Sequence, residues 1–420
     1  MRKIKTGLLV LLTITGKLMI AQNIKDETVE YHFTKLPLTP LPGTIQNYQS
    51  SISATYEAEN QKKKDAYEAE KKVAQAELAK EQAAYPARVK AADDQYNIEM
   101  EGWKKKSLGE KVVEKQVLGE NTNKPVKQVP PQPVMRYVPE PILQTSYDYP
   151  VVAKTYLILD GFNNKPENAV KIEVTMYGFD YTEPRQISEQ KNVTSYANGQ
   201  TSTNAVMYYH NEFSYRHTMS VKVSTPDGKE LFNLTPQELN TYKIYKTPES
   251  TTPVPLNAEL LVKTNEAKIL QDNLTLINNL VNDKIGYKQT ARKTELYYVK
   301  SKDDTYKDLL VAFNDASAGL KILIDDPASA KAKLQSAAQA WNTALQESDV
   351  KNKKARIDKD VTIAVCFNLL ECYFALGDSV NADKIITQLN GIDLSSSKRK
   401  DKEDYEALFN DLKKRVAVNK

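Results

Sequence analysis

The sequence of residues 45–103 is IQNYQSSISATYEAENQKKKDAYEAEKKVAQAELAKEQAAYPARVKAADDQYNIEMEGW, rich in Ala, Glu, Lys and Gln and without glycine before Gly102. Apolar residues recur in it at every eleventh position. One row is Ile45, Tyr56, Tyr67, Leu78, Val89 and Met100, and a second is Ala74, Tyr85 and Tyr96. Eleven residues make three turns at about 3.67 residues per turn, which keeps a row on one face of a nearly straight helix. The spacing predicts a long helical arm over residues 45–118.

Pro86 lies inside this arm, where proline would normally end or kink a helix. The rows keep their spacing across it, and the flanking AAYPAR has no turn residues, so we prefer one kinked helix to a hairpin that turns at Pro86. A helix over residues 45–103, roughly 90 Å long, cannot bury its apolar stripe alone. The stripe needs a second copy, the returning chain or a client protein. Its candidate partner-binding residues are Tyr56, Tyr67, Leu78, Tyr85, Val89, Tyr96 and Met100.

A proline-rich linker follows over residues 119–146. Its prolines are Pro125, Pro130, Pro131, Pro133, Pro139 and Pro141. This composition predicts an extended, polyproline-like connection. The roughly 40 residues between Trp103, where the helical pattern ends, and Tyr147 can reach about 120 Å at 3.1 Å per residue, enough to run back along the arm. The alternative is a proline-rich ligand for an aromatic groove of another protein.

The first 21 residues have the pattern of a secretory signal peptide. Arg2, Lys3 and Lys5 precede a short apolar run, and LMIA precedes a polar segment, which predicts cleavage after Ala21. A membrane anchor is the alternative, but Lys17 interrupts the run well before the roughly 20 residues that a span needs. No later segment is apolar enough to span a bilayer. We expect an exported protein, periplasmic or outer-membrane-associated if the cell is Gram-negative, or secreted.

The formal charge of +4, from 58 basic and 54 acidic residues, belongs to this signal. Four basic residues and no acid lie in it, so removal leaves 58 − 4 = 54 basic against 54 acidic residues. A neutral chain gives no global support to nucleic-acid binding, because that affinity grows with the number of phosphates neutralised.

Residues 147–252 change to strand chemistry. Four apolar or alternating runs are Val151–Leu159, Val170–Phe179, Asn204–Phe213 and Thr218–Ser224. Short strands separated by turn residues predict an antiparallel β-sandwich. Residues 22–44 form a leading segment that alternates like a strand and can join this β domain. The many tyrosines here have a second interpretation, a glycan-binding platform.

The chain lacks the motifs of common enzymes. His32, His210 and His217 have no accompanying Cys or carboxylate cluster, and neither G-x-S-x-G nor a phosphate-binding glycine loop occurs. Cys366 and Cys372 are expected as buried core residues. We predict no catalytic, metal or cofactor site.

Residues 253–420 show helical periodicity, and residues 369–386, LLECYFALGDSVNADKII, resemble a tetratricopeptide repeat. Leu370 and Ser379 depart from its usual small and aromatic residues. Ala337, Trp341 and Ala344 resemble the second helix of a preceding repeat. The resemblance implies helix pairs that bind peptides or proteins, with Trp341 and Tyr373 as candidate contact residues. An ordinary helical bundle is the alternative.

The sequence thus predicts a multidomain α+β protein with a long helical arm, an antiparallel β-sandwich and a C-terminal tetratricopeptide-like α-helical domain. The leading hypothesis is an exported, non-catalytic scaffold or adaptor of the cell envelope. Its partners would be envelope or secreted proteins, or a second copy through the arm. Alternatives are a periplasmic holdase for outer-membrane or secreted clients and a glycan-binding protein.

Overall fold

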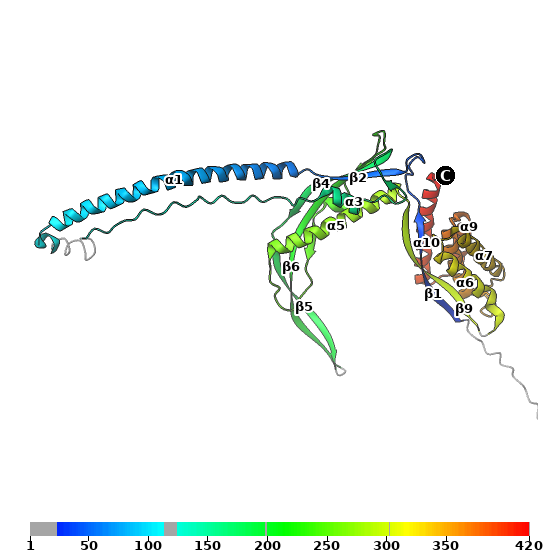
Figure 1. Ribbon diagram of the computed structural model, residues 1–420. Helices are drawn as coiled ribbons and strands as arrows, with labels where there is room; N and C mark the ends of the chain where they lie inside the picture. The colour runs from blue at the N-terminus through cyan, green and yellow to red at the C-terminus, as the bar shows by residue number, and fades with distance from the viewer. Residues whose placement is uncertain (1–22, 113–123, 198–199, 302, 420) are drawn as a thin grey trace, which may run out of the picture.

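A computed structural model describes residues 23–112, 124–197, 200–301 and 303–419. The predicted signal peptide lies outside these residues. The chain is a mixed α/β protein with an open sheet, a helical C-terminal region and one very long helix that leaves the sheet (Figure 1).

The open sheet has seven strands in the order β3-β2-β4-β6-β5, with β7 and β8 also paired to β6. Its strands are β2 (Asn47–Ala54), β3 (Asn163–Asn164), β4 (Ala169–Tyr181), β5 (Arg185–Ala197), β6 (Gln200–Ser224), β7 (Glu230–Leu234) and β8 (Lys243–Lys246). The second half of β6 pairs with β4 and its first half with β5, so β5 and β6 continue beyond the sheet as a two-stranded hairpin (Figure 1).

One face of this sheet is buried. Along β4, Val170, Ile172 and Val174 are buried, whereas Lys171 and Glu173 between them are exposed. Two helices share the core of the buried face, α3 (Tyr149–Tyr156) and α5 (Ala258–Ile285); a short α4 (Gln237–Asn240) precedes β8. We predicted a sandwich of two sheets over residues 147–252, but these strands join in one sheet and helices supply the facing layer. The sheet with α3, α4 and α5 is called the sheet body below.

A second body, the helical body, begins with the leading segment. β1 (Asn23–Lys35) pairs antiparallel with β9 (Lys288–Lys300) along its whole length. Behind them pack η1 (Asp304–Tyr306), α6 (Lys307–Lys321), α7 (Pro327–Leu345), α8 (Lys359–Leu376), α9 (Ser379–Asn390) and α10 (Ser396–Val418). Cys366 and Cys372 are buried in α8 and unbonded, as predicted.

Two predictions about this region are wrong. The leading strand does not join the central sheet; it pairs with β9, because Val29 and Tyr31 bury against the helical core together with Leu296. Residues 253–420 are not all helical and not one body: α5 packs on the sheet, and the alternating ELYYV within β9 is a strand signal that we missed.

Asp283, near the end of α5, joins the two bodies. Its side chain accepts hydrogen bonds from Lys35 at 2.7 Å and from Arg415 at 2.8 Å. Arg415, almost fully buried, also donates to the carbonyl of Leu36 at 2.7 Å. Burial alone would raise the pKa of Asp283, but the two cations outweigh it and hold that pKa below its usual value.

The long helix, α1 (Glu57–Lys105), runs without interruption through Pro86, as preferred from the sequence. It begins at Glu57 instead of residue 45. Ile45 and Tyr56 belong to the core of the sheet body, because the Ser-rich NYQSSISA forms strand β2 beside β4. The first two positions of the predicted row therefore lie outside the helix.

His217 in β6 gives the sheet body a pH-dependent stability. Burial lowers the pKa of His217 to about 4, against about 6.5 in an unfolded chain. The unfolded chain therefore binds the proton more tightly, and stability is lost as the pH falls from 6.5 towards 4. Lowering the pH from 7.5 to 5.5 should lower the free energy of unfolding by about 1 kcal/mol through His217. Urea unfolding at the two pH values measures this change. His217→Gln should remove this loss and His32→Gln, on the exposed face of β1, should keep it; equal slopes in both variants would contradict the assignment.

Candidate functional site

The chain returns along α1 through residues 124–146, the return segment, which contains neither helix nor strand. It runs antiparallel to α1 (Figure 1). Near the base, Asn60 and the backbone of Gln144 exchange two hydrogen bonds, at 2.9 and 3.0 Å. Further out, Tyr85 donates to the carbonyl of Pro130 at 3.1 Å. The outermost of these contacts is the ion pair of Lys127 with Asp93, at 2.8 Å.

These contacts show that the return segment is extended, with a rise per residue like that of a polyproline helix. From residue 60 to residue 93, α1 advances about 50 Å at 1.5 Å per residue. The return segment covers the same interval between residues 144 and 127, about 53 Å at the polyproline rise of 3.1 Å. The two lengths agree, so each residue of the return segment spans about the same distance as two residues of α1. We call α1 and the return segment together the rod.

The return segment covers the predicted stripe. Six predicted candidates are half-buried on α1 between exposed neighbours: Tyr67, Leu78, Tyr85, Val89, Tyr96 and Met100. Ala74, in the second row, is 1% exposed. Of the three partners considered for the stripe, the structure places the returning chain there. The seventh candidate, Tyr56, lies in the sheet core and donates to the carbonyl of Thr145 at 3.0 Å.

Trp341 and Tyr373 do not lie on a surface. Trp341 is fully buried between the helices, and Tyr373 is 6% exposed. The Tyr373 hydroxyl accepts a hydrogen bond from Asn342 at 2.6 Å. Both residues stabilise the core of the helical body, so neither can contact a partner in this arrangement. Large aromatic residues at such positions can pack between helices or contact a partner. The spacing in the sequence alone did not distinguish these two roles.

The tyrosines proposed for glycan binding are largely engaged within the chain. Tyr147 and Tyr149 are half-buried, and their hydroxyls donate to Glu266 and Glu57. Tyr215 stacks on Phe179 with ring centroids 5.9 Å apart. These rings order the base of the rod and the sheet core.

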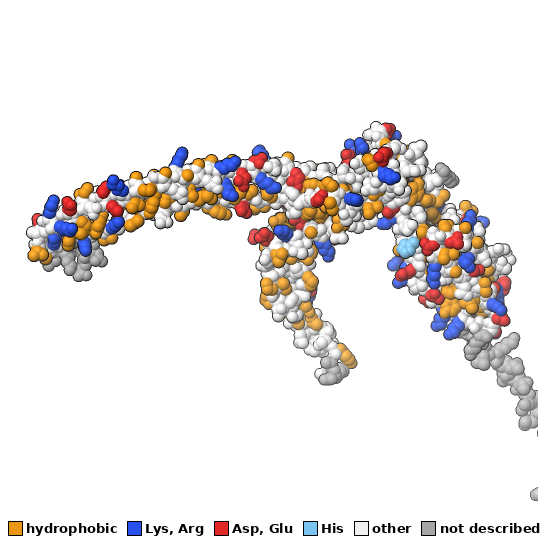
Figure 2. Space-filling model, viewed as in Figure 1, with side chains coloured by type: hydrophobic (Ala, Val, Ile, Leu, Met, Phe, Trp, Pro, Cys, Tyr) orange, Lys and Arg blue, Asp and Glu red, His pale blue; other side chains and the backbone are white. Residues whose placement is uncertain are grey.

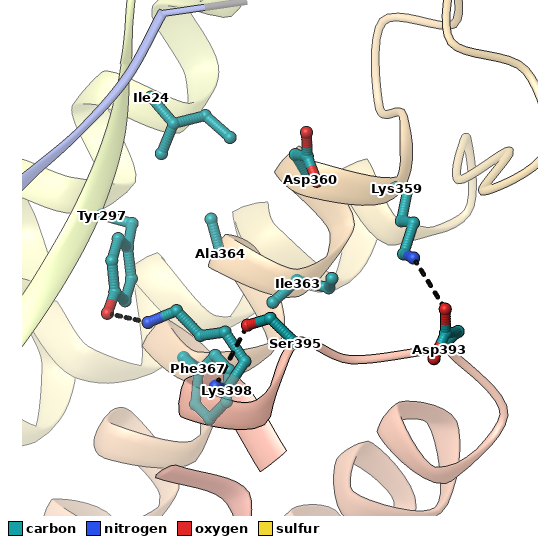
Figure 3. Close-up of a pocket in the computed structure, with 10 residues that line it drawn as sticks. All are labelled: Ile24, Tyr297, Lys359, Asp360, Ile363, Ala364, Phe367, Asp393, Ser395 and Lys398. Atoms are coloured by element: carbon teal, nitrogen blue, oxygen red, sulfur yellow. Dashed lines mark hydrogen bonds and ion pairs between the residues drawn. The ribbon is translucent and has the colours of Figure 1, made fainter. Parts of the chain in front are cut away.

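The helical body contains an open pocket of about 280 Å³ (Figure 3). Apolar groups from β1 and α8 line it: Ile24, Ile363, Ala364 and Phe367. Its charged residues are two lysines and two aspartates: Lys359, Lys398, Asp360 and Asp393. The lining is therefore mixed apolar and polar, and its four charged side chains sum to zero.

Lys398 closes one side of this pocket. Its ammonium lies 4.6 Å from the ring centre of Tyr297 and 5.1 Å from that of Phe367, and it donates to the Tyr297 hydroxyl at 2.6 Å. Burial disfavours this charge, but the hydrogen bonds to Tyr297 and Asp401 outweigh burial and raise the pKa of Lys398. The ammonium is therefore a fixed part of the wall.

A buried ion pair lies beside a neighbouring cavity of about 400 Å³ that Arg292 lines. Glu371 is fully buried and receives Arg292 in two hydrogen bonds, at 2.7 and 2.8 Å. Thr294 and Tyr405 donate to the same carboxylate at 2.9 and 2.5 Å. Burial alone would raise the pKa of Glu371, but these donors hold it below its usual value. We missed this residue, although a lone carboxylate in the apolar run AVCFNLLECYFAL was a visible signal.

Within the described ranges, no three metal-ligating side chains come together. None of the described helices is both long and apolar enough to cross a lipid bilayer. The chain matches no protein-family model, no curated protein and no solved structure. Its function therefore has to be inferred from its own residues.

Replacing Arg292 tests the buried pair. Arg292→Ala leaves the Glu371 carboxylate buried without its cation, which should lower the unfolding free energy by about 3 to 5 kcal/mol. Lys293→Ala, at the next residue of β9, removes only an exposed contact to Glu30 at 3.3 Å and should cost less than about 1 kcal/mol. Urea unfolding followed by circular dichroism measures both. Similar losses in the two variants would show that Glu371 does not depend on Arg292.

Enlarging Ala74 tests whether the return segment lies on α1. Ala74→Leu puts a larger side chain where the two elements touch, so it should loosen the return segment and speed tryptic cleavage after Lys127 and Arg136. Ala76→Leu is the matched control, because Ala76 is exposed on the same helix. Equal cleavage rates in both variants and the parent chain would argue against this packing.

Proposed function

We propose that this chain is an exported, non-catalytic scaffold or adaptor protein of the cell envelope. The observation that carries the proposal is the rod. Its 49-residue helix extends about 74 Å from a base formed by the sheet body. A length of that kind serves no compact catalytic centre, whereas it suits a protein that holds other components apart or together.

Mutual support between its two elements favours the rod as a spacer. An isolated helix would expose its tyrosine stripe, and an isolated polyproline segment would have no fixed direction. Packed together, they bury the stripe, and ion pairs such as Arg136 with Glu70 at 2.9 Å fix the register. The rod can therefore hold whatever binds along it at a set distance from the two bodies.

The helical body supplies the second binding surface in this proposal. We propose that α8 and α9 form a tetratricopeptide-like helix pair. Gly377 between them has φ +70°, a left-handed conformation that favours glycine, and Ala382 is fully buried where α9 crosses its neighbours. Such pairs are suited to peptide binding, and the pocket beside Lys398 has room for an apolar side chain of a partner.

Excising the rod tests the adaptor role. Residues 57–146 can be replaced by a short Gly-Ser linker, because Tyr56 and Tyr149, on the two sides of the excision, come together at the base, where their hydroxyl oxygens lie 3.5 Å apart. We expect the full chain to be recovered in covalent complexes after cross-linking in intact cells, and the excised variant to lose most of them. The matched control shortens the β5–β6 hairpin, which also projects but leaves the rod intact, and should keep the complexes.

Fractionation of the same cells tests the compartment. We expect the chain in the envelope or the medium, with a new N-terminus at Gln22. A protein recovered from the cytoplasm, or only as a free monomer after cross-linking, would contradict the proposal.

A further inference from the structure

The return segment carries apolar residues in adjacent pairs at every fourth position. The pairs are Pro125 and Val126, Val129 and Pro130, Pro133 and Val134, Tyr137 and Val138, and Pro141 and Ile142. One member of each pair is half-buried or buried towards α1: Pro125, Pro130, Pro133, Val138 and Pro141. The other members form a second row, the outer row, which no described part of the chain covers.

The outer row is strongly exposed. Val126, Val129, Val134, Tyr137 and Ile142 are between 63% and 88% exposed, and apolar side chains line the rod in the space-filling view (Figure 2). At roughly 150 to 250 Å² for a fully exposed large side chain, the row presents on the order of 700 Å². This area approaches the roughly 800 Å² that each partner buries in a stable interface.

Two cations of the return segment, Arg136 and Lys127, are turned away from the outer row. Arg136 pairs with Glu70 at 2.9 Å and Glu77 at 3.6 Å, and Lys127 pairs with Asp93 at 2.8 Å, all on α1. These ion pairs neutralise both cations on the side of the helix. A surface that approaches the outer row therefore meets apolar side chains without an unpaired charge at its centre.

We propose that the outer row binds the outer row of a second copy of this chain, so that two rods lie antiparallel with their return segments in contact. The spacing of four of its five members fits itself under a twofold axis, while Val126 lies opposite Thr145 of the other copy. Val134 and Tyr137 are equally far from the midpoint between residues 135 and 136, and so are Val129 and Ile142. Val134 then faces Tyr137 of the other copy, and Val129 faces Ile142.

The remaining charges do not oppose this pairing. In the same register Glu140 lies opposite Pro131 of the other copy, and Lys124 lies opposite Tyr147 near the base of its rod. Arg136 lies opposite Met135 of the other copy and beside that copy's Arg136, but each of the two guanidiniums is paired with Glu70 and Glu77 of its own α1. The pairing goes beyond the adaptor role and does not depend on it, because it requires only this chain.

Sedimentation velocity of the purified chain tests the proposal over a range of concentrations. We expect the purified chain to form a dimer. In the triple variant Val134→Ser, Tyr137→Ser, Ile142→Ser the dissociation constant of the dimer should rise at least roughly 100-fold, because central apolar contacts dominate such interfaces. The matched control, Val151→Ser, Leu260→Ser, Val380→Ser, changes side chains of 58%, 60% and 68% exposure elsewhere and should leave the dimer unchanged. Circular dichroism checks that both variants remain folded.

Spin labels test the geometry. With one label per copy at residue 134, the two labels of a dimer should be offset by about 9 Å along the rods, at 3.1 Å per residue. With one label per copy at residue 126, the offset should be about 59 Å, at the same rise per residue. A short distance at both positions would mean parallel pairing and would overturn the proposal. So would a monomer at all concentrations, a dimer indifferent to the outer-row variant, or an outer row that binds an unfolded polypeptide instead of its own copy. If the full chain formed the dimer but gave no cross-linked complexes with other proteins in cells, that result would count only against the adaptor role.

Discussion

The contact between a helix and a polyproline-type segment determines the shape of this protein. An α-helix advances about 1.5 Å per residue and a polyproline-type segment about 3.1 Å. The return segment therefore needs about half as many residues as α1 to cover the same distance. The return segment ends beside the start of α1, where Asn60 binds the backbone of Gln144. The chain therefore re-enters the sheet body close to the point where it left.

The two bodies at the base depend on two carboxylates removed from water, Asp283 in part and Glu371 completely. Asp283 is held between Lys35 and Arg415, and Glu371 between Arg292 and the hydroxyls of Thr294 and Tyr405. A buried carboxylate is tolerated only when cations and hydroxyls replace the water that it loses. Each of these carboxylates binds side chains distant in sequence, so each fixes a tertiary contact that local propensity does not specify.

The sequence predicted those features that repeat along the chain. The rows through Tyr67, Leu78 and Val89 indicated the helix, and the prolines of residues 119–146 indicated an extended return. The start of the helix was wrong because Tyr56 and Ile45 keep the eleven-residue spacing by coincidence while they pack in the sheet. The partner of β1 and the burial of Trp341 were beyond reach, because both depend on which distant elements meet. The same holds for the pocket beside Lys398, whose lining comes from β1, β9, α8 and the start of α10.

The tyrosines at the base explain how a long excursion is compatible with a stable sheet. Tyr56 packs in the sheet core just after the end of β2, and Tyr149 is the first residue of α3. Both rings lie where the rod leaves the sheet. Tyr149 donates to Glu57 in the first turn of α1, while Tyr147 and Thr145 donate to Glu266 of α5. The point where the rod departs is thus bonded to the helix that covers the sheet. Bending the rod at its base would break hydrogen bonds to half-buried carboxylates, so its direction is coupled to the packing of α5.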